Sequence, residues 1–349
     1  MSAALDASLA MRVKAAWYVA CESSALRKAP RAVTLLGQKV VLFRDGRGTA
    51  CALADRCPHR NVPLSMGRVT AQGQLECGYH GWCFDGTGAC RAVPGLLDQN
   101  PELPARAATR FACQERQGFV WVWATPGESP AEEPPTFPHV GEPGWTTVRR
   151  SSRLKASLHA AVENTLDVPH TAFLHGGLFR TAKKSNDLEV VVRRTERVAE
   201  AEYLGEPAPR GLIGRILAPG GGTVQHFDRF ILPSLAQVEY RLGESGVFST
   251  SAFTPVSAYE TDLFAVVTFK LPLPGWLVRP FVQPVAVRIL QQDARMLSAQ
   301  VDTVQAFGGE RYTSTELDVL GHEIALLVEQ AATGKRAPAA KEHRVRMRT

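Results

Sequence analysis

Four side chains that can bind metal occur as two closely spaced pairs in the first third of the chain. Cys57 and His59 lie in the sequence CPHR, and Cys77 and His80 lie in CGYHGW. Two thiolates and two imidazoles can hold one zinc ion tetrahedrally. They can also hold a two-iron, two-sulfide cluster, with the thiolates on one iron and the imidazoles on the other. The single residue between Cys57 and His59 favours the cluster, because paired ligands of a structural zinc ion are usually separated by two or more residues.

Each pair is expected to occupy its own β-turn loop. Pro58 restricts the backbone of the first loop, while Gly78 and Gly81 let the backbone of the second loop approach the sulfides closely. Two neutral imidazoles in place of two thiolates leave the cluster less negative, which raises its reduction potential relative to an all-cysteine cluster. On this reading, the two loops would clamp one cluster between them.

A second set of ligands lies in the sequence ENTLDVPHTAFLH, which contains Asp167, His170 and His175. Two imidazoles and one carboxylate on one face of an octahedron leave three positions open, the arrangement by which ferrous iron binds oxygen beside a substrate. His170 and His175 are five residues apart, about 140° around an ideal helix, so an undistorted helix would not direct both at one ion. Pro169 predicts the necessary break in the helix.

The third ligand of such a site is expected to be a carboxylate far away in the sequence. Asp293 falls on an otherwise largely apolar stripe of a predicted helix, together with Val285, Ile289, Met296 and Gln300. A buried carboxylate on such a stripe is unfavourable unless it meets a cation. Asp302, nine residues further on, would point to the opposite side of the helix and is expected to be solvated.

The two sets of ligands resemble the motifs of Rieske non-haem iron oxygenases. The resemblance extends to CPHRNVPLSMG with CGYHGWCFDG, to the EN that precedes the second set, and to QQDAR around Asp293. It implies that Cys57 and Cys77 bind one iron of a [2Fe-2S] cluster and that His59 and His80 bind the other.

The same resemblance assigns roles in the second half of the chain. It implies that His170, His175 and Asp293 bind one mononuclear Fe(II). It further implies that Asp167 links His170 to the partner subunit's His80 and passes electrons between them.

Two departures from related motifs refine this prediction. Gly78 stands where many relatives have proline, which loosens the second loop without removing a ligand. High-potential respiratory relatives add a disulfide between the loops, and the corresponding residues here are Val62 and Tyr79. The resemblance therefore implies a low-potential, oxygenase-type protein that receives electrons from NAD(P)H through a ferredoxin or flavin reductase.

The chain is expected to have an α+β fold with two domains. We predict an N-terminal arm, an all-β Rieske domain, a proline-rich linker, a mononuclear iron catalytic domain and a basic tail, at residues 1–15, 16–125, 126–145, 146–334 and 335–349. The resemblance implies that the catalytic domain is of the helix-grip type, an antiparallel sheet around a long helix. Helical spacing predicts closing helices at about 282–305 and 315–332.

Charge and cysteine content exclude several other classes of protein. The net charge of +6 is concentrated in residues 335–349, which hold six Lys or Arg and one Glu, so we expect a solvated tail and no nucleic-acid partner. An odd count of seven cysteines without a secretory signal favours reduced thiols and the cytoplasm. The most apolar window, 271–290, contains two arginines and four prolines, so we expect a buried wall and no membrane span.

The predicted function is that of a terminal oxygenase that uses O2 and reductase-derived electrons. The resemblance implies a homotrimer that hydroxylates, or oxidatively demethylates, a small aromatic or alicyclic substrate, and we favour monooxygenation over dihydroxylation. Two alternatives remain open: a Rieske electron carrier whose second domain is inactive, and a zinc-stapled binder of hydrophobic ligands. Alternation along residues 224–231 offers both faces of that strand to the substrate, and His159, His226 and His322 are expected to be structural.

Overall fold

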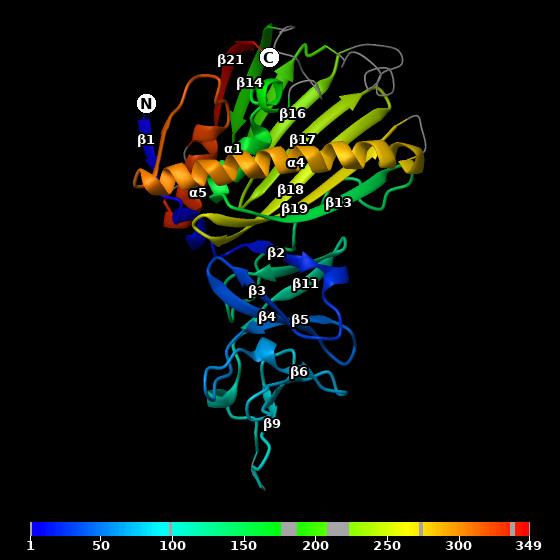
Figure 1. Ribbon diagram of the computed structural model, residues 1–349, viewed down its shortest axis with the longest axis vertical. Coiled ribbons are helices and arrows are strands. Elements are labelled where there is room, and N and C mark those ends of the chain that lie inside the picture. The colour runs from blue at the N-terminus through cyan, green and yellow to red at the C-terminus, as the bar shows by residue number, and fades with distance from the viewer. Residues whose placement is uncertain are drawn as a thin grey trace. The chain divides into compact units, whose positions relative to one another are not determined.

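The computed structural model describes residues 2–97, 100–175, 187–207, 223–271, 275–335 and 339–348 (Figure 1). The chain forms two compact units. One unit contains Lys14–Thr136, and the other contains Met1–Val13 together with Phe137–Thr349. This division places the two predicted sets of metal ligands in different units.

The N-terminal unit is built from short antiparallel strands. Its first two sheets have the strand orders β10-β5-β4-β3 and β11-β12-β2. Their strands are β2 (Trp17–Glu22), β3 (Arg31–Leu35), β4 (Gln38–Arg44), β5 (Ala50–Ala54), β10 (Arg110–Phe111), β11 (Cys113–Arg116) and β12 (Phe119–Trp123). Every residue of β12, the sequence FVWVW, is buried, as expected for an apolar strand at the centre of its sheet.

A third sheet of the N-terminal unit has the order β6-β7-β8-β9. Its strands are β6 (Arg68–Val69), β7 (Leu75–Glu76), β8 (Cys83–Phe84) and β9 (Cys90–Ala92). The loop that carries Cys77 and His80 connects β7 to β8. The loop that carries Cys57 and His59 follows β5.

The second unit contains an eight-stranded antiparallel sheet of order β13-β19-β18-β17-β16-β15-β14-β21. The strands are β13 (Thr146–Leu154), β14 (Asp187–Arg194), β15 (Val198–Leu204), β16 (Gln225–Ile231), β17 (Leu235–Leu242), β18 (Ser245–Ser257), β19 (Glu260–Lys270) and β21 (Lys341–Arg348). A separate pair joins β1 (Ser2–Leu5) to β20 (Glu310–Thr313). This sheet and the helix that crosses it confirm the predicted α+β fold.

The helices of the second unit position the predicted iron ligands. They are α1 (Leu158–Leu166), α2 (Thr171–Leu174), α4 (Gly275–Ala306) and α5 (Gly321–Thr333). The Ser157 hydroxyl accepts a hydrogen bond from the Ala160 amide at 3.2 Å and so caps α1. Leu158, Ala161 and Val162 of α1 are buried in the core formed with the sheet, and Figure 1 shows the long helix α4 lying across the sheet.

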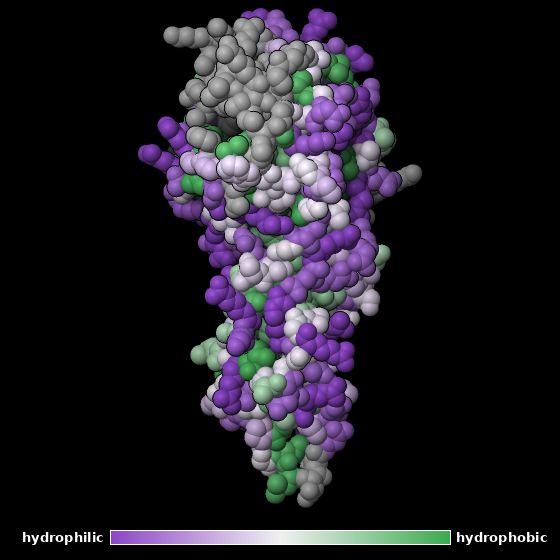
Figure 2. Space-filling view, turned by 90° about the vertical axis from the view of Figure 1, so that its right-hand side faces the viewer, coloured by the Kyte–Doolittle hydropathy of each residue, from purple (hydrophilic) through white to green (hydrophobic). Residues whose placement is uncertain are grey.

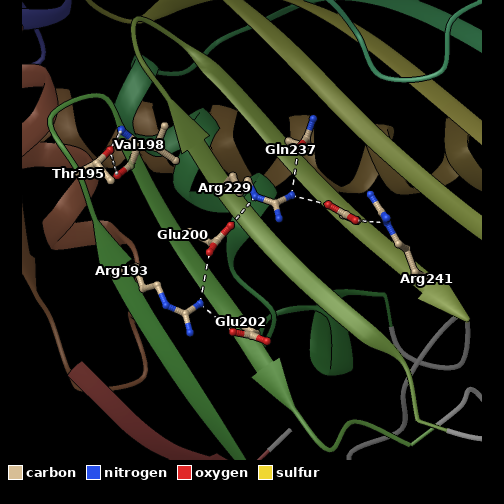
Figure 3. A network of polar contacts seen from close by, with 9 residues as sticks. Arg193, Thr195, Val198, Glu200, Glu202, Arg229, Gln237 and Arg241 are labelled. Atoms are coloured by element: carbon tan, nitrogen blue, oxygen red, sulfur yellow. Dashed lines mark hydrogen bonds and ion pairs between the residues drawn. The ribbon is translucent and has the colours of Figure 1, made fainter. Parts of the chain in front are cut away.

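The strand register defines the two faces of this sheet. Asp228 and Phe230 lie on the face that packs against α1, which we call the inner face. Arg229 lies on the outer face, in a ladder of ion pairs that crosses β14 to β17 (Figure 3). The ladder contains Arg193, Glu200, Glu202, Arg229, Glu239 and Arg241. The structure therefore selects Val224, His226, Asp228 and Phe230 as the inward-facing set of that strand, with Gln225, Phe227, Arg229 and Ile231 facing outward.

The prediction of a solvated basic tail is correct for the exposed arginines of residues 341–348, but these residues are not a frayed end. These residues form β21, which pairs with β14 along its whole length. Arg344 pairs with Glu189 and Arg348 with Asp187, so acidic residues far away in the sequence neutralise the tail. On the inner face of β21, Met347 is buried in the core.

Both closing helices exist, but their starts differ from the prediction. Helix α4 begins at Gly275, before Pro280 and Pro284, although each proline removes a helical hydrogen bond. Helix α5 begins at Gly321, because residues 315–320 form turns. The apolar window is not a continuous buried wall either, since 74% of Trp276 is exposed.

The surface shown in Figure 2 is mostly hydrophilic. Hydrophobic surface appears at the end of the N-terminal unit. Leu97 and Leu103, which follow β9 in the sequence, are exposed. Among the described helices, none has the length and apolar character needed to cross a membrane.

Candidate metal centres

The two loops of the N-terminal unit repeat one backbone arrangement. The Cys57 amide donates to the Val62 carbonyl at 2.9 Å, and the Cys77 amide donates to the Trp82 carbonyl at 2.8 Å. In each loop the residue four positions after the cysteine donates back to the cysteine carbonyl and has a positive φ, 61° at Asn61 and 71° at Gly81. The loops are therefore two copies of one rigid turn, each presenting a cysteine and a histidine.

The cysteines of these loops are buried and the histidines lie at the surface. Cys57 and Cys77 are 1% and 2% exposed. Burial, together with the neighbouring Cys77, raises the pKa of the Cys57 thiol to about 11, against backbone hydrogen bonds that lower it. A buried thiol pair of this kind favours a cation, which would stabilise the thiolates.

The two histidine rings lie side by side at the exposed end of the loops. The His59 and His80 ring centroids are 4.6 Å apart, and Trp82 stacks on His59 at 4.8 Å with an interplanar angle of 5°. In the described part of the chain, no three of the four predicted ligands bring their ligand atoms within 4.8 Å of one another. One tetrahedral zinc ion would require that approach, whereas a cluster spreads its ligands over two irons.

The chain bends sharply between the ligands of the second site. Helix α1 ends at Leu166, and its C-cap Asp167 has an extended conformation. His170 and His175 then lie at either end of the four-residue helix α2. The break predicted from Pro169 is thus present, and the two histidine rings come to 5.2 Å between centroids.

Asp293 of α4 meets both histidines, so the structure brings all three predicted ligands together. Its Oδ1 atom lies 3.1 Å from His175 Nε2 and 3.7 Å from His170 Nε2. The ligand atoms of His170, His175 and Asp293 lie within 4.8 Å of one another. Asp302, in contrast, is exposed and pairs with Lys155, as expected.

Neighbouring side chains orient these ligands toward a cation. His175 Nδ1 lies 3.0 Å from Gln292 Oε1, an acceptor, so this nitrogen carries the proton and Nε2 presents a lone pair. Asp293 Oδ1 is buried and has no hydrogen-bonding partner among the described residues. A lone pair and a carboxylate oxygen that face each other without a proton fit a bound metal ion.

Asp167 and Asn164 complete the surroundings of the site. Asp167 Oδ2 lies 3.3 Å from His170 Nδ1 and accepts a hydrogen bond from the His170 amide at 3.3 Å. Burial lowers the pKa of His170, but Asp167 and Asp293 outweigh it and the pKa is raised. Burial also raises the pKa of Asp293, against the effects of the two histidines and a hydrogen bond from Asn164.

Sequence reasoning did not identify Gln292 or assign a role to Asn164. Both are amides that hydrogen-bond a predicted ligand from a position beside another site residue. Gln292 precedes Asp293 directly, and Asn164 lies one helical turn before Asp167. Adjacency to a ligand was the only signal in the sequence, since an amide carries no charge or spacing pattern of its own.

Comparison with known protein families agrees with this division of the chain. Residues 16–104 match the Rieske [2Fe-2S] domain. Residues 154–332, about half of the chain, match the vanillate O-demethylase oxygenase C-terminal domain. The chain belongs to the Rieske oxygenase family.

Several proteins similar to this family member are known. The chain is 30% identical to the chloroplastic protein TIC 55 of Arabidopsis thaliana, over 78% of the chain and 50% of that protein. It is 37% identical to a putative toluene-4-sulfonate monooxygenase iron-sulfur subunit of Comamonas testosteroni, over 53% of each protein. The chain thus spans about half the length of these curated relatives.

A crystal structure shares the fold of most of the chain. Dicamba monooxygenase bound to 3,6-dichlorosalicylic acid superposes with a TM-score of 0.78 at 23% identity. The match covers 92% of this chain and 97% of that one. This Rieske oxygenase-family member therefore has the two-part fold that the resemblance implied.

Proposed function

We propose that the protein is the terminal oxygenase component of a Rieske non-haem iron system. It would use O2 and electrons from a reductase to hydroxylate, or oxidatively demethylate, a small organic substrate. The observation that carries the proposal is the meeting of three ligand atoms, since the buried Asp293 Oδ1 lies 3.1 Å from His175 Nε2 and 3.7 Å from His170 Nε2. Two imidazoles and one carboxylate are the ligand set of oxygen-activating ferrous iron.

Each predicted cofactor has a set of side chains that fits it. Cys57, Cys77, His59 and His80 would hold a [2Fe-2S] cluster, which would store one electron at a time. His170, His175 and Asp293 would hold Fe(II), which would supply the oxygen chemistry because this site leaves coordination positions open. Gln292 keeps the His175 proton on Nδ1, and Asp167 holds the His170 ring from the opposite side.

We further propose that Asp167 joins the two kinds of centre across subunits of a homotrimer. Asp167 is in contact with His170, and 31% of its side chain is exposed, so it remains accessible to a second group. The exposed His80 is a suitable partner, because an imidazole can donate a proton to a carboxylate. The seven free cysteines suit a reducing compartment such as the cytoplasm.

The activity is tested by oxygen uptake with a surrogate ferredoxin or flavin reductase and NAD(P)H. We expect substrate-stimulated uptake over a panel of aromatic and alicyclic compounds, and incorporation of 18O from labelled O2 into the product. His175→Ala should abolish product formation while the cluster absorbance remains. Product formation by His175→Ala at the wild-type rate would refute the proposal.

The two alternative functions predict different metal contents. An electron carrier with an inactive second domain would show the cluster without mononuclear iron. A zinc-stapled binder would be colourless and would contain no sulfide. Neither alternative explains why the buried Asp293 oxygen faces the Nε2 atoms of two histidines.

A further inference from the structure

A buried histidine on the inner face of the sheet forms a stack with two tyrosines. His226 is 0% exposed, and its ring lies between those of Tyr203 and Tyr240, with centroids 4.2 and 4.1 Å away. His226 Nδ1 lies 2.6 Å from Glu206 Oε2, and Nε2 lies 3.0 Å from Asp228 Oδ1. Both ring nitrogens are thus engaged with carboxylates, so the imidazolium cannot bind a ligand itself and instead fixes the tyrosines on either side.

The stack follows one cross-strand row of the inner face. The register places Tyr203 of β15, His226 of β16, Tyr240 of β17 and Val247 of β18 directly opposite one another in turn. At the first end of the row, Tyr203 is buried in the same core as Leu166 and Val168, the residues on either side of Asp167. At its other end the row reaches a more open part of the sheet.

The open part is a patch of seven half-buried inner-face residues, which we call the floor patch. Its members are Arg150, Val238, Tyr240, Val247, Ser249, Ala265 and Val267. The register makes them neighbours, because Val238 lies opposite Ser249, Ser249 opposite Val267, and Ala265 opposite Arg150. The flanking inner-face residues Phe230, Phe253 and Leu263 are buried.

The floor patch lies next to the helices that carry the predicted iron ligands. Val238 and Ala265 pack against the same core as Ala294 of α4, which directly follows Asp293. Helix α1, whose C-cap is Asp167, packs on β17, β18 and β19. The short side chains of valine, alanine and serine are only half-buried here, which suits contact with a small apolar molecule.

Arg150 is the only charged member of the floor patch. It lies on the inner face of β13, between the buried Val148 and Leu154, and has no ion-pair or hydrogen-bond partner among the described residues. Arg153 of the same strand faces outward and pairs with Asp262 at 2.7 Å. A guanidinium on the core side of a sheet without a carboxylate is an available site for an anionic group.

The separation of Arg150 and Tyr240 sets the size of the molecule that could contact both. They lie three strands apart, and the cross-strand row of Tyr240 meets β13 at Thr146, four residues before Arg150, so their backbones are about 20 Å apart. An arginine and a tyrosine side chain that both extended into this interval would leave space for about one substituted ring.

We propose that the floor patch binds the substrate of the oxygenase, with Arg150 binding an anionic group of the substrate and Tyr240, held by His226, positioning its ring. This inference rests on the proposed function and deepens it. Arg150 is then a specificity-determining residue that selects small aromatic acids over their neutral counterparts. Tyr240 contacts the substrate, and His226 is a positioning residue that acts through Tyr240.

The role of Arg150 is tested by binding, without turnover. Anaerobic equilibrium dialysis of the holoenzyme would compare 4-methoxybenzoate with its neutral counterpart 4-methoxybenzamide. We expect the wild type to prefer the acid by about 10- to 100-fold, as for a charge-assisted hydrogen bond. Arg150→Gln should lose that preference while binding the amide as before, and the matched control Arg153→Gln should retain it.

Several results would overturn the role of Arg150. They are equal binding of acid and amide by the wild type, binding of neither probe, an unchanged preference in Arg150→Gln, and the same loss in Arg153→Gln. Failure of the proposed function would look different, because no compound would be oxidised and labelled oxygen would not enter any product. Oxidation of neutral compounds alone would overturn this inference and leave the proposed function standing.

The role of Tyr240 is tested by the coupling of oxygen uptake to product. Tyr240→Leu removes the ring, so we expect less product per O2 consumed at an unchanged melting temperature. Tyr240→Phe keeps the ring on His226 and should restore the coupling. A coupling ratio in Tyr240→Leu equal to that of the wild type, or no rescue by phenylalanine, would contradict a positioning role.

Discussion

The buried His226 cluster predicts a distinctive pH dependence of stability. Burial alone would lower the pKa of His226, but Asp228 and Glu206 outweigh it and raise the pKa to about 9. The folded state therefore keeps this proton at pH values where the unfolded chain, with an ordinary histidine pKa of about 6.5, has released it. The resulting stabilisation is fully present below about pH 6.5 and is lost as the pH rises through about 9.

The magnitude follows from the difference between the two pKa values. A shift of about 2.5 pKa units corresponds to roughly 3 kcal/mol of unfolding free energy. Urea unfolding of the wild type and His226→Gln at pH 6, 8 and 10 and fixed protein concentration measures it. We expect the stability difference between the two proteins to shrink by about that amount from pH 6 to pH 10. A difference that stays constant with pH would refute the assignment of a protonated His226.

Three further substitutions test other parts of the structure. Gln292→Leu removes the acceptor of the His175 proton and should weaken iron binding by about 10- to 100-fold, measured by iron titration with the cluster absorbance unchanged. Asp167→Asn should retain both metal centres but lower turnover by about the same factor, and an unchanged rate would contradict its linking role. Glu323→Leu leaves the buried Arg194 without its carboxylate partner and should lower the free energy of unfolding by about 3–5 kcal/mol, measured by urea unfolding. The control Glu329→Leu removes an exposed ion pair with Lys335 and should lower it by only about 0–1 kcal/mol.

Short-range spacing made the metal ligands predictable. Each cysteine of the first site is two or three residues from its histidine, as in Cys57 with His59 and Cys77 with His80. Residues this close in the sequence must also be close in space, so their pairing was predictable. His170 and His175 required only one local break at the end of α1. Asp293 was predictable from helical periodicity, because a carboxylate on an apolar stripe of a helix is unfavourable unless it meets a cation.

Features that depend on strand pairing were not predictable. Alternation along β16 allowed either face to turn inward, and only the register with β15 and β17 places His226 in the core. The basic residues of β21 were not predicted to form a strand, because their acidic partners lie more than a hundred residues earlier, on β14. Glu206 likewise reaches His226 across twenty residues.

The central claim is that one chain carries a [2Fe-2S] cluster and a separate mononuclear iron site, and metal and sulfide analysis with electron paramagnetic resonance tests it most directly. We predict three irons and two sulfides per chain in the wild type and in the control Asp302→Ala, whose carboxylate is exposed on the same helix. Asp293→Ala should lose one iron and keep the cluster signal. Zinc in place of the cluster, or an unchanged iron content in Asp293→Ala, would contradict the account.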